Sequence, residues 1–157
     1  MARKQHFLTG ILCVAVLAAC LVPAAGLAGD VDQAALKAAI DKYLSDIDQK
    51  KFYQITPKVV NTQRQVRPNL ILLDVRKPEE VKKLGIIPGA KNIRLNSLMK
   101  SLDQLPSKKA PIIIYCKGGA RGTMAVGFLG LMGYTDVKNM KGGFTAWTKA
   151  SFPVEKK

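Results

Sequence analysis

Residues 111–122 constrain the fold of this 157-residue chain more than any other stretch. Residues 112–115 form a short apolar run rich in β-branched side chains, which predicts a buried strand. Three glycines follow within seven residues, and glycine allows a tight turn and a close approach of backbone to a ligand. From Arg121, apolar residues recur at helical spacing as far as Gly133, a typical helix end. The stretch therefore predicts a strand, a tight loop and a helix, with Cys116 at the start of the loop.

Cys116 is the candidate nucleophile of this loop. Backbone N–H groups and the positive end of the following helix converge on the loop and favour an anion there. Lys117 and Arg121 add positive charge, so these surroundings favour the thiolate form of the cysteine. The alternative is a small buried apolar residue, the usual role of a free cysteine, but the loop favours a reactive thiol. The anion cradle is predicted to comprise Lys117, Gly118, Gly119, Ala120, Arg121 and Gly122.

Residues 1–28 have the pattern of an export signal. Basic residues come first, residues 7–22 are almost wholly apolar, and small residues continue to Gly29. A permanent membrane anchor is disfavoured because the apolar run is short for a span and breaks at Pro23. The residues before Cys20 resemble a lipobox, so the alternative is a lipoprotein anchored through this cysteine. In either case we expect a periplasmic or otherwise exported protein without a stable membrane span.

Removal of this signal would limit the chemistry available to the mature chain. It would leave 23 basic and 11 acidic residues, a formal charge of +12, no histidine, and Cys116 as the single cysteine. No intramolecular disulfide, Cys–His or Ser–His pair, or zinc site built on these residues would then exist. We therefore expect no metal and no cofactor.

The mature chain is long enough for one domain. Residues 29–55 are predicted to contain an amphipathic helix over 31–47 and a connector, with Phe52 and Tyr53 as core anchors. Residues 56–157 would form the main domain. Its first helix should begin at Thr56, followed by proline at the first helical position.

Strand and helix patterns alternate through the main domain. Further strands are predicted over residues 70–76, 92–95 and 136–140, each followed by a helical pattern. This alternation predicts an α/β fold with a central parallel sheet between two helical layers. Because ligand sites lie at the carboxyl ends of such strands, Asp74 and Arg76 are expected near the cysteine loop.

The motifs resemble those of the rhodanese-like domain family, over roughly residues 56–153. The resemblance rests on Leu72-Leu73-Asp74-Val75-Arg76, Pro78-Glu79-Glu80, Gly85-Ile86-Ile87-Pro88-Gly89-Ala90-Lys91-Asn92-Ile93, Tyr115-Cys116 through Arg121, Gly133-Tyr134 and Gly142-Gly143-Phe144-Thr145-Ala146-Trp147. It implies a rhodanese-like α/β/α fold and a sulfurtransferase, similar to small periplasmic thiosulfate sulfurtransferases. Sulfur would pass from thiosulfate or a similar anionic donor, through a persulfide on the cysteine, to cyanide or a thiol acceptor.

Two positions depart from the family pattern. Ile86 stands where the family often has a histidine of structural importance, so little catalytic loss is expected. Gly122 stands where many members have serine, and glycine is expected to loosen the start of the helix.

Supporting roles follow for the charged residues near the loop. Arg121 is expected to orient the loop, with Asp74 as its expected partner, and Lys117 to attract the anionic donor. The alternative for Lys117 is a solvated surface lysine. For Asp74 and Arg76 a structural ion pair behind the loop is favoured over a direct chemical role.

Three other functional classes compete with sulfur transfer. A nucleic-acid partner is disfavoured because the basic residues are spread without interleaved aromatics. A persulfide carrier or a partner-docking module without turnover is the main alternative to an enzyme. A phosphatase or arsenate reductase would need a wider loop than the four residues between Cys116 and Arg121, and no acid is expected beside the loop to protonate a leaving group. The oligomeric state is not predicted.

Overall fold

The computed structural model describes residues 32–49 and 53–156. The predicted export signal, with Cys20, and the predicted anchor Phe52 lie outside these residues. No helix within the described part of the chain is long and apolar enough to cross a membrane.

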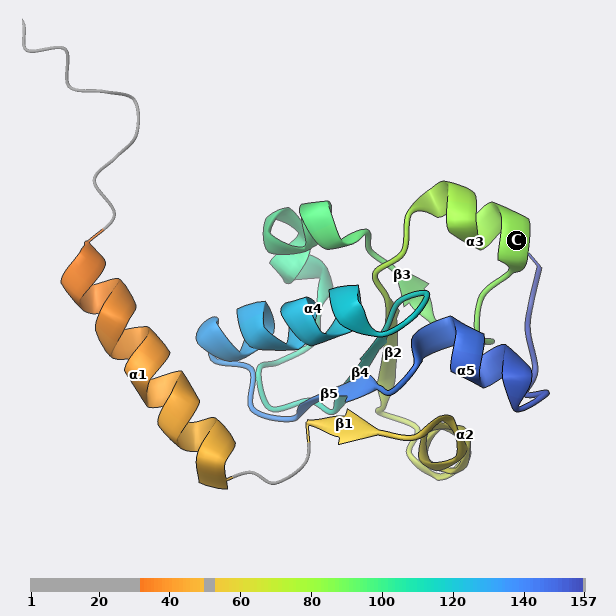
Figure 1. Ribbon diagram of the computed structural model, residues 1–157, viewed down its shortest axis with the longest axis horizontal. Helices are drawn as coiled ribbons and strands as arrows, with labels where there is room; N and C mark the ends of the chain where they lie inside the picture. Colours follow the sequence, from red (N-terminus) through yellow and green to blue (C-terminus); the bar gives the residue numbers. More distant parts are fainter. Residues whose placement is uncertain (1–31, 50–52, 157) are drawn as a thin grey trace, which may run out of the picture. The chain divides into compact units, whose positions relative to one another are not determined.

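Five parallel strands form one sheet in the order β1-β5-β4-β2-β3 (Figure 1). The strands are β1 (Gln54–Ile55), β2 (Ile71–Asp74), β3 (Lys91–Asn92), β4 (Ile112–Tyr115) and β5 (Val137–Met140). All four residues of β4 are buried because helices cover both faces of this central strand. A continuous apolar run is what such burial requires.

Helices cover the sheet on both sides and divide the core in two. The helices are α1 (Gln33–Gln49), α2 (Pro57–Val66), α3 (Pro78–Leu84), the 3₁₀ helix η1 (Leu95–Gln104), α4 (Ala120–Leu131) and α5 (Gly143–Lys149). One core cluster joins the sheet to η1 and α4, through residues such as Leu98, Ala125 and Leu129. The other joins it to α2, α3 and α5, through residues such as Val60, Val81 and Trp147. Figure 1 shows these two groups on opposite faces of the sheet.

Capping residues in the sequence mark several helix ends in the structure. Thr56 caps α2 by accepting a hydrogen bond from the N–H of Val59, with proline next in the chain. Gly85 ends α3 with a φ of +83° that glycine tolerates. The strand predicted over residues 92–95 is the shorter β3, and the helical pattern after it is the 3₁₀ helix η1, which begins at Leu95.

The connector before the main domain differs from the prediction. Gln54 and Ile55 form β1, paired with β5 at the edge of the sheet. Tyr53 is 41% exposed, so it is not a core anchor. Its carbonyl oxygen instead accepts a hydrogen bond from the N–H of Asn139, because edge pairing places the backbone of residue 53, rather than its side chain, against β5.

The amphipathic helix predicted near the N-terminus is present as α1. Tyr43 packs on α4, where its hydroxyl lies 3.5 Å from the carbonyl oxygen of Val126. A Cβ atom at Gly130 would lie 2.0 Å from the Tyr43 ring, so glycine is needed for this contact.

Candidate active site

Cys116 follows β4 directly, at the carboxyl end of the sheet's central strand. Its side chain is 1% exposed, and the backbone N–H of Gly119 donates to its Sγ at an N···S distance of 3.1 Å. The sulfur is therefore held inside the loop by a backbone donor, as a thiolate or an anionic sulfur atom requires.

The loop needs glycine at the residue that makes this contact. Gly119 has a φ of +112°, which L-residues with side chains rarely adopt. Helix α4 begins at the next residue, Ala120, and the N–H of Thr123 donates to the carbonyl oxygen of Gly119 at 3.0 Å. The predicted order of strand, loop and helix is thus present, and the turn brings an amide back to the sulfur.

The start of α5 supports the loop from its other side. The N–H groups of Phe144 and Thr145 donate to the carbonyl oxygens of Cys116 and Lys117, at 2.7 and 2.9 Å. A Cβ atom at Gly143 would lie 2.3 Å from the Cys116 carbonyl oxygen. The Gly-Gly-Phe motif therefore allows the backbone at the start of α5 to pack closely against the backbone of the cysteine loop.

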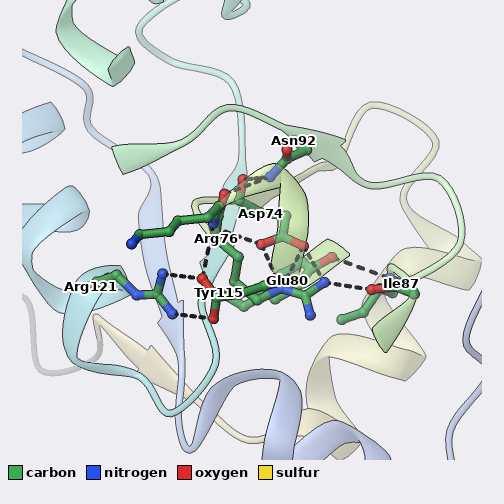
Figure 2. A network of polar contacts seen from close by, with 9 residues as sticks. Asp74, Arg76, Glu80, Ile87, Asn92, Tyr115 and Arg121 are labelled. Atoms are coloured by element: carbon green, nitrogen blue, oxygen red, sulfur yellow. Dashed lines mark hydrogen bonds and ion pairs between the residues drawn. The ribbon is translucent and has the colours of Figure 1, made fainter. Parts of the chain in front are cut away.

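Arg121 is held by Glu80 of α3. Two hydrogen bonds of 2.6 and 2.8 Å join the guanidinium to the carboxylate, and Glu80 also accepts one from the N–H of Lys77 at 3.0 Å. The expected partner Asp74 is not the one used, because its carboxylate is already engaged by Arg76 (Figure 2). Sequence reasoning missed Glu80 as a site residue, and the one pattern that pointed to it was its place in the Pro-Glu-Glu motif.

This ion pair shifts the pKa of both groups away from neutrality. The hydrogen bond from Arg121 is the main cause that lowers the pKa of Glu80 from its ordinary value of 4.5 to about 2. The same bond raises the pKa of Arg121, and the nearby Cys116 acts in the same direction. An acid does lie beside the loop, contrary to expectation, but at neutral pH it is ionised and cannot donate a proton to a leaving group.

Acid should therefore weaken the fold through Glu80. Because the folded pKa is depressed, the stabilisation by this carboxylate is fully present above about pH 4.5 and is lost as the pH falls towards 2. The pair is partly exposed and screened by solvent, so we expect a contribution of about 1–2 kcal/mol. Urea unfolding at pH 6 and pH 3 should show a larger loss of stability in the wild type than in Glu80→Gln. Equal losses in the two proteins would contradict this assignment.

Asp74 and Arg76 form the buried ion pair predicted from the sequence. Both side chains are fully buried, and three hydrogen bonds of 2.6–3.0 Å join the guanidinium to the carboxylate. Arg76 also donates to the Gly85 carbonyl oxygen at 2.7 Å, and its Cζ lies 3.9 Å from the centroid of the Phe144 ring. The pair therefore links β2, α3 and α5 beneath the loop and is closed off from solvent.

The two departures from the family pattern have structural explanations. Ile86 is 1% exposed and pairs with Glu155 in an antiparallel bridge, so it occupies the core. Gly122 lies against the side chain of Asn139, where a Cβ atom would come within 2.2 Å of Oδ1. The first turn of α4 contains the backbone hydrogen bond from the Thr123 N–H to the Gly119 carbonyl oxygen.

The remaining loop residues face solvent. Lys117, Gly118 and Ala120 are exposed, so both the lysine and the outer rim of the loop are accessible to an incoming anion. Within residues 32–49 and 53–156, no group of three or more His, Cys, Asp or Glu side chains is placed to hold a metal ion.

Comparison with known proteins identifies the family. Residues 57–150 match the Rhodanese family, described as the rhodanese-like domain. The chain belongs to the rhodanese-like domain family. The five-strand parallel sheet with helices on both faces is the fold of this family, as expected from the sequence motifs.

Several relatives are named as sulfurtransferases. A sulfurtransferase from Allochromatium vinosum is 33% identical over 86 residues, which cover 55% of this chain and 78% of the relative. The thiosulfate sulfurtransferase GlpE from Pseudoalteromonas translucida is 35% identical over 89 residues, covering 54% and 78%. The polysulfide-sulfur transferase homodimer from Wolinella succinogenes matches with a TM-score of 0.60 and 25% identity, over 80% of this chain and 90% of that one. This rhodanese-like chain is therefore related to the sulfurtransferases.

Proposed function

We propose that this protein is a sulfurtransferase that carries sulfane sulfur as a persulfide on Cys116. The observation that carries the proposal is the hydrogen bond from the Gly119 N–H to the cysteine sulfur, within a loop of four residues between Cys116 and Arg121. Such a loop offers backbone hydrogen-bond donors to one anionic sulfur atom. Because the nucleophile is already a thiolate, the reaction requires no general base.

The first half-reaction loads the cysteine. The Cys116 thiolate attacks the outer sulfur of thiosulfate, a new S–S bond forms, and sulfite leaves with the electrons of the bond that breaks. The positive charge of the exposed Lys117 would attract the dianion, whereas the charge of Arg121 is balanced by Glu80. The relation to a thiosulfate sulfurtransferase supports this choice of donor.

The second half-reaction unloads it. A thiophile such as cyanide attacks the outer sulfur of the persulfide, thiocyanate leaves, and the thiolate is restored. Atoms and electrons balance over the two steps without an added oxidant or reductant. The loop amides can stabilise the anionic sulfur in both steps, which is electrostatic stabilisation by preorganised donors.

The protein should gain one sulfur atom from thiosulfate. We expect intact-mass measurement after incubation to show this single addition on Cys116, and cyanide to reverse it with release of thiocyanate. Aryl phosphates should not be hydrolysed, because Glu80 is ionised and the loop is one residue shorter than a phosphatase loop. A protein that is never loaded, yet turns over phosphate esters, would refute the proposal. If neither reaction occurs, the docking module without turnover becomes the better interpretation.

A further inference from the structure

Asn139 lies behind the cysteine loop, on the strand next to β4. It is the third residue of β5, and its side chain is buried, with 1% of the residue exposed. Its Nδ2 donates to the Gly119 carbonyl oxygen at 3.2 Å and to the Thr123 hydroxyl oxygen at 2.9 Å. A buried side chain thus holds the residue whose N–H reaches the sulfur.

The backbone of Gly119 requires hydrogen bonds from its surroundings to fix its conformation, because a glycine backbone rotates more freely than that of other residues. At a φ of +112° glycine has no Cβ to restrict the turn, and only contacts with the surroundings can fix the direction of its N–H. Its carbonyl oxygen is held by the Thr123 N–H and by Asn139 together. The carbonyl group and the N–H of Gly119 lie in two adjacent peptide planes that meet at its Cα, so anchoring the carbonyl fixes one of the two planes whose relative rotation sets the direction of the N–H.

Gly122 makes room for this amide. A Cβ atom at position 122 would lie 2.2 Å from Oδ1 and 3.1 Å from Cγ of Asn139, so the amide cannot stay in place beside any larger residue. Oδ1 is buried without a hydrogen-bond partner among the described residues. Leaving a buried acceptor such as Oδ1 without a partner costs free energy. The two hydrogen bonds donated by Nδ2 are therefore the interactions that determine the orientation of the amide.

We propose that Asn139 is the positioning residue of the sulfur-binding loop, aiming the Gly119 amide at Cys116, and that Gly122 is required for it to do so. The inference builds on the proposed function of Cys116 as sulfur carrier. It concerns the thiol before any sulfur is loaded, so it can be tested without a donor.

The Asn139→Ala variant tests the donor. Iodoacetamide alkylation of Cys116, followed against pH, should have its midpoint raised by about one pH unit, a roughly tenfold loss of thiolate below both midpoints. Asn92→Ala is the matched control, since Asn92 likewise makes two hydrogen bonds through Nδ2, but to the backbone carbonyls of Asp74 and Arg76 and from the edge strand β3. It should lose stability without moving the midpoint. A folded Asn139→Ala protein with the wild-type midpoint would overturn the proposal.

The Gly122→Ala variant tests the same contact from the other side. It should raise the alkylation midpoint in the wild-type background, because the new Cβ displaces the Asn139 amide, and should add little in an Asn139→Ala background. Gly127→Ala is the control in the same helix, where a Cβ atom meets nothing within 4 Å. Both substitutions replace glycine by alanine within α4, so a shift confined to position 122 supports the proposal, and additive shifts in the double variant refute it. Failure of sulfur loading alongside these shifts would reject the proposed function and leave the positioning role intact.

Discussion

Replacement of Cys116 by serine is expected to abolish sulfur transfer while leaving the fold intact. A serine hydroxyl is not ionised at neutral pH and cannot hold sulfane sulfur in a persulfide, so both half-reactions stop at the first step. The side chain is buried and accepts a hydrogen bond from the Gly119 N–H, which a serine oxygen can also accept. Cyanide-dependent thiocyanate formation from thiosulfate should fall to the rate without protein.

The same experiment on the full-length chain tests whether sulfur is loaded on Cys116 rather than on another cysteine. Cys13 and Cys20 are still present in it, so they serve as internal control thiols. The Cys116→Ser variant should have the thermal unfolding midpoint of the wild type and no loading by thiosulfate. Turnover that persists in a folded variant would assign the chemistry to a residue other than Cys116.

The elements around Cys116 could be predicted because their signals are local. Residues 112–115 are continuously apolar, and the glycines and helical spacing that follow give the order of strand, loop and helix. These patterns follow one another along one stretch of the chain, residues 111–133, so the local spacing of residues is enough to predict the elements.

The contacts of the site could not be predicted in the same way, because they join distant segments. Glu80 and Arg121 are 41 residues apart, and Asp74 was an equally suitable partner for Arg121 from its place at the strand end. The choice follows from packing: Arg76 is drawn into the core over Phe144 and takes the Asp74 carboxylate. Asn139 had the pattern of an ordinary strand residue, and β1, with two residues, is too short for any periodic signal.

The Asp74→Ala variant is expected to lose about 3–5 kcal/mol of unfolding free energy, the cost of leaving one charge of a buried pair without its partner. The Arg76 guanidinium would remain fully buried, with the Gly85 carbonyl oxygen as its remaining hydrogen-bond acceptor among the described residues. Such a loss is a large part of the 5–15 kcal/mol that stabilises a typical domain. Urea unfolding at neutral pH measures it directly, and a loss below about 1 kcal/mol would show that the pair is not buried as described.

A double variant separates the cost of the unpaired charge from the value of the pair itself. Asp74→Leu with Arg76→Met removes both charges and retains apolar volume, so it should be more stable than Asp74→Ala. Recovery should remain incomplete, because the Gly85 carbonyl oxygen loses its donor and the Arg76 N–H loses the Asp74 carboxylate. If the double variant is no more stable than Asp74→Ala, the destabilisation arises from lost hydrogen bonds and packing over Phe144. If it recovers most of the loss, the buried charge is the cause, and the pair contributes mainly by fixing how β2, α3 and α5 meet beneath the cysteine loop.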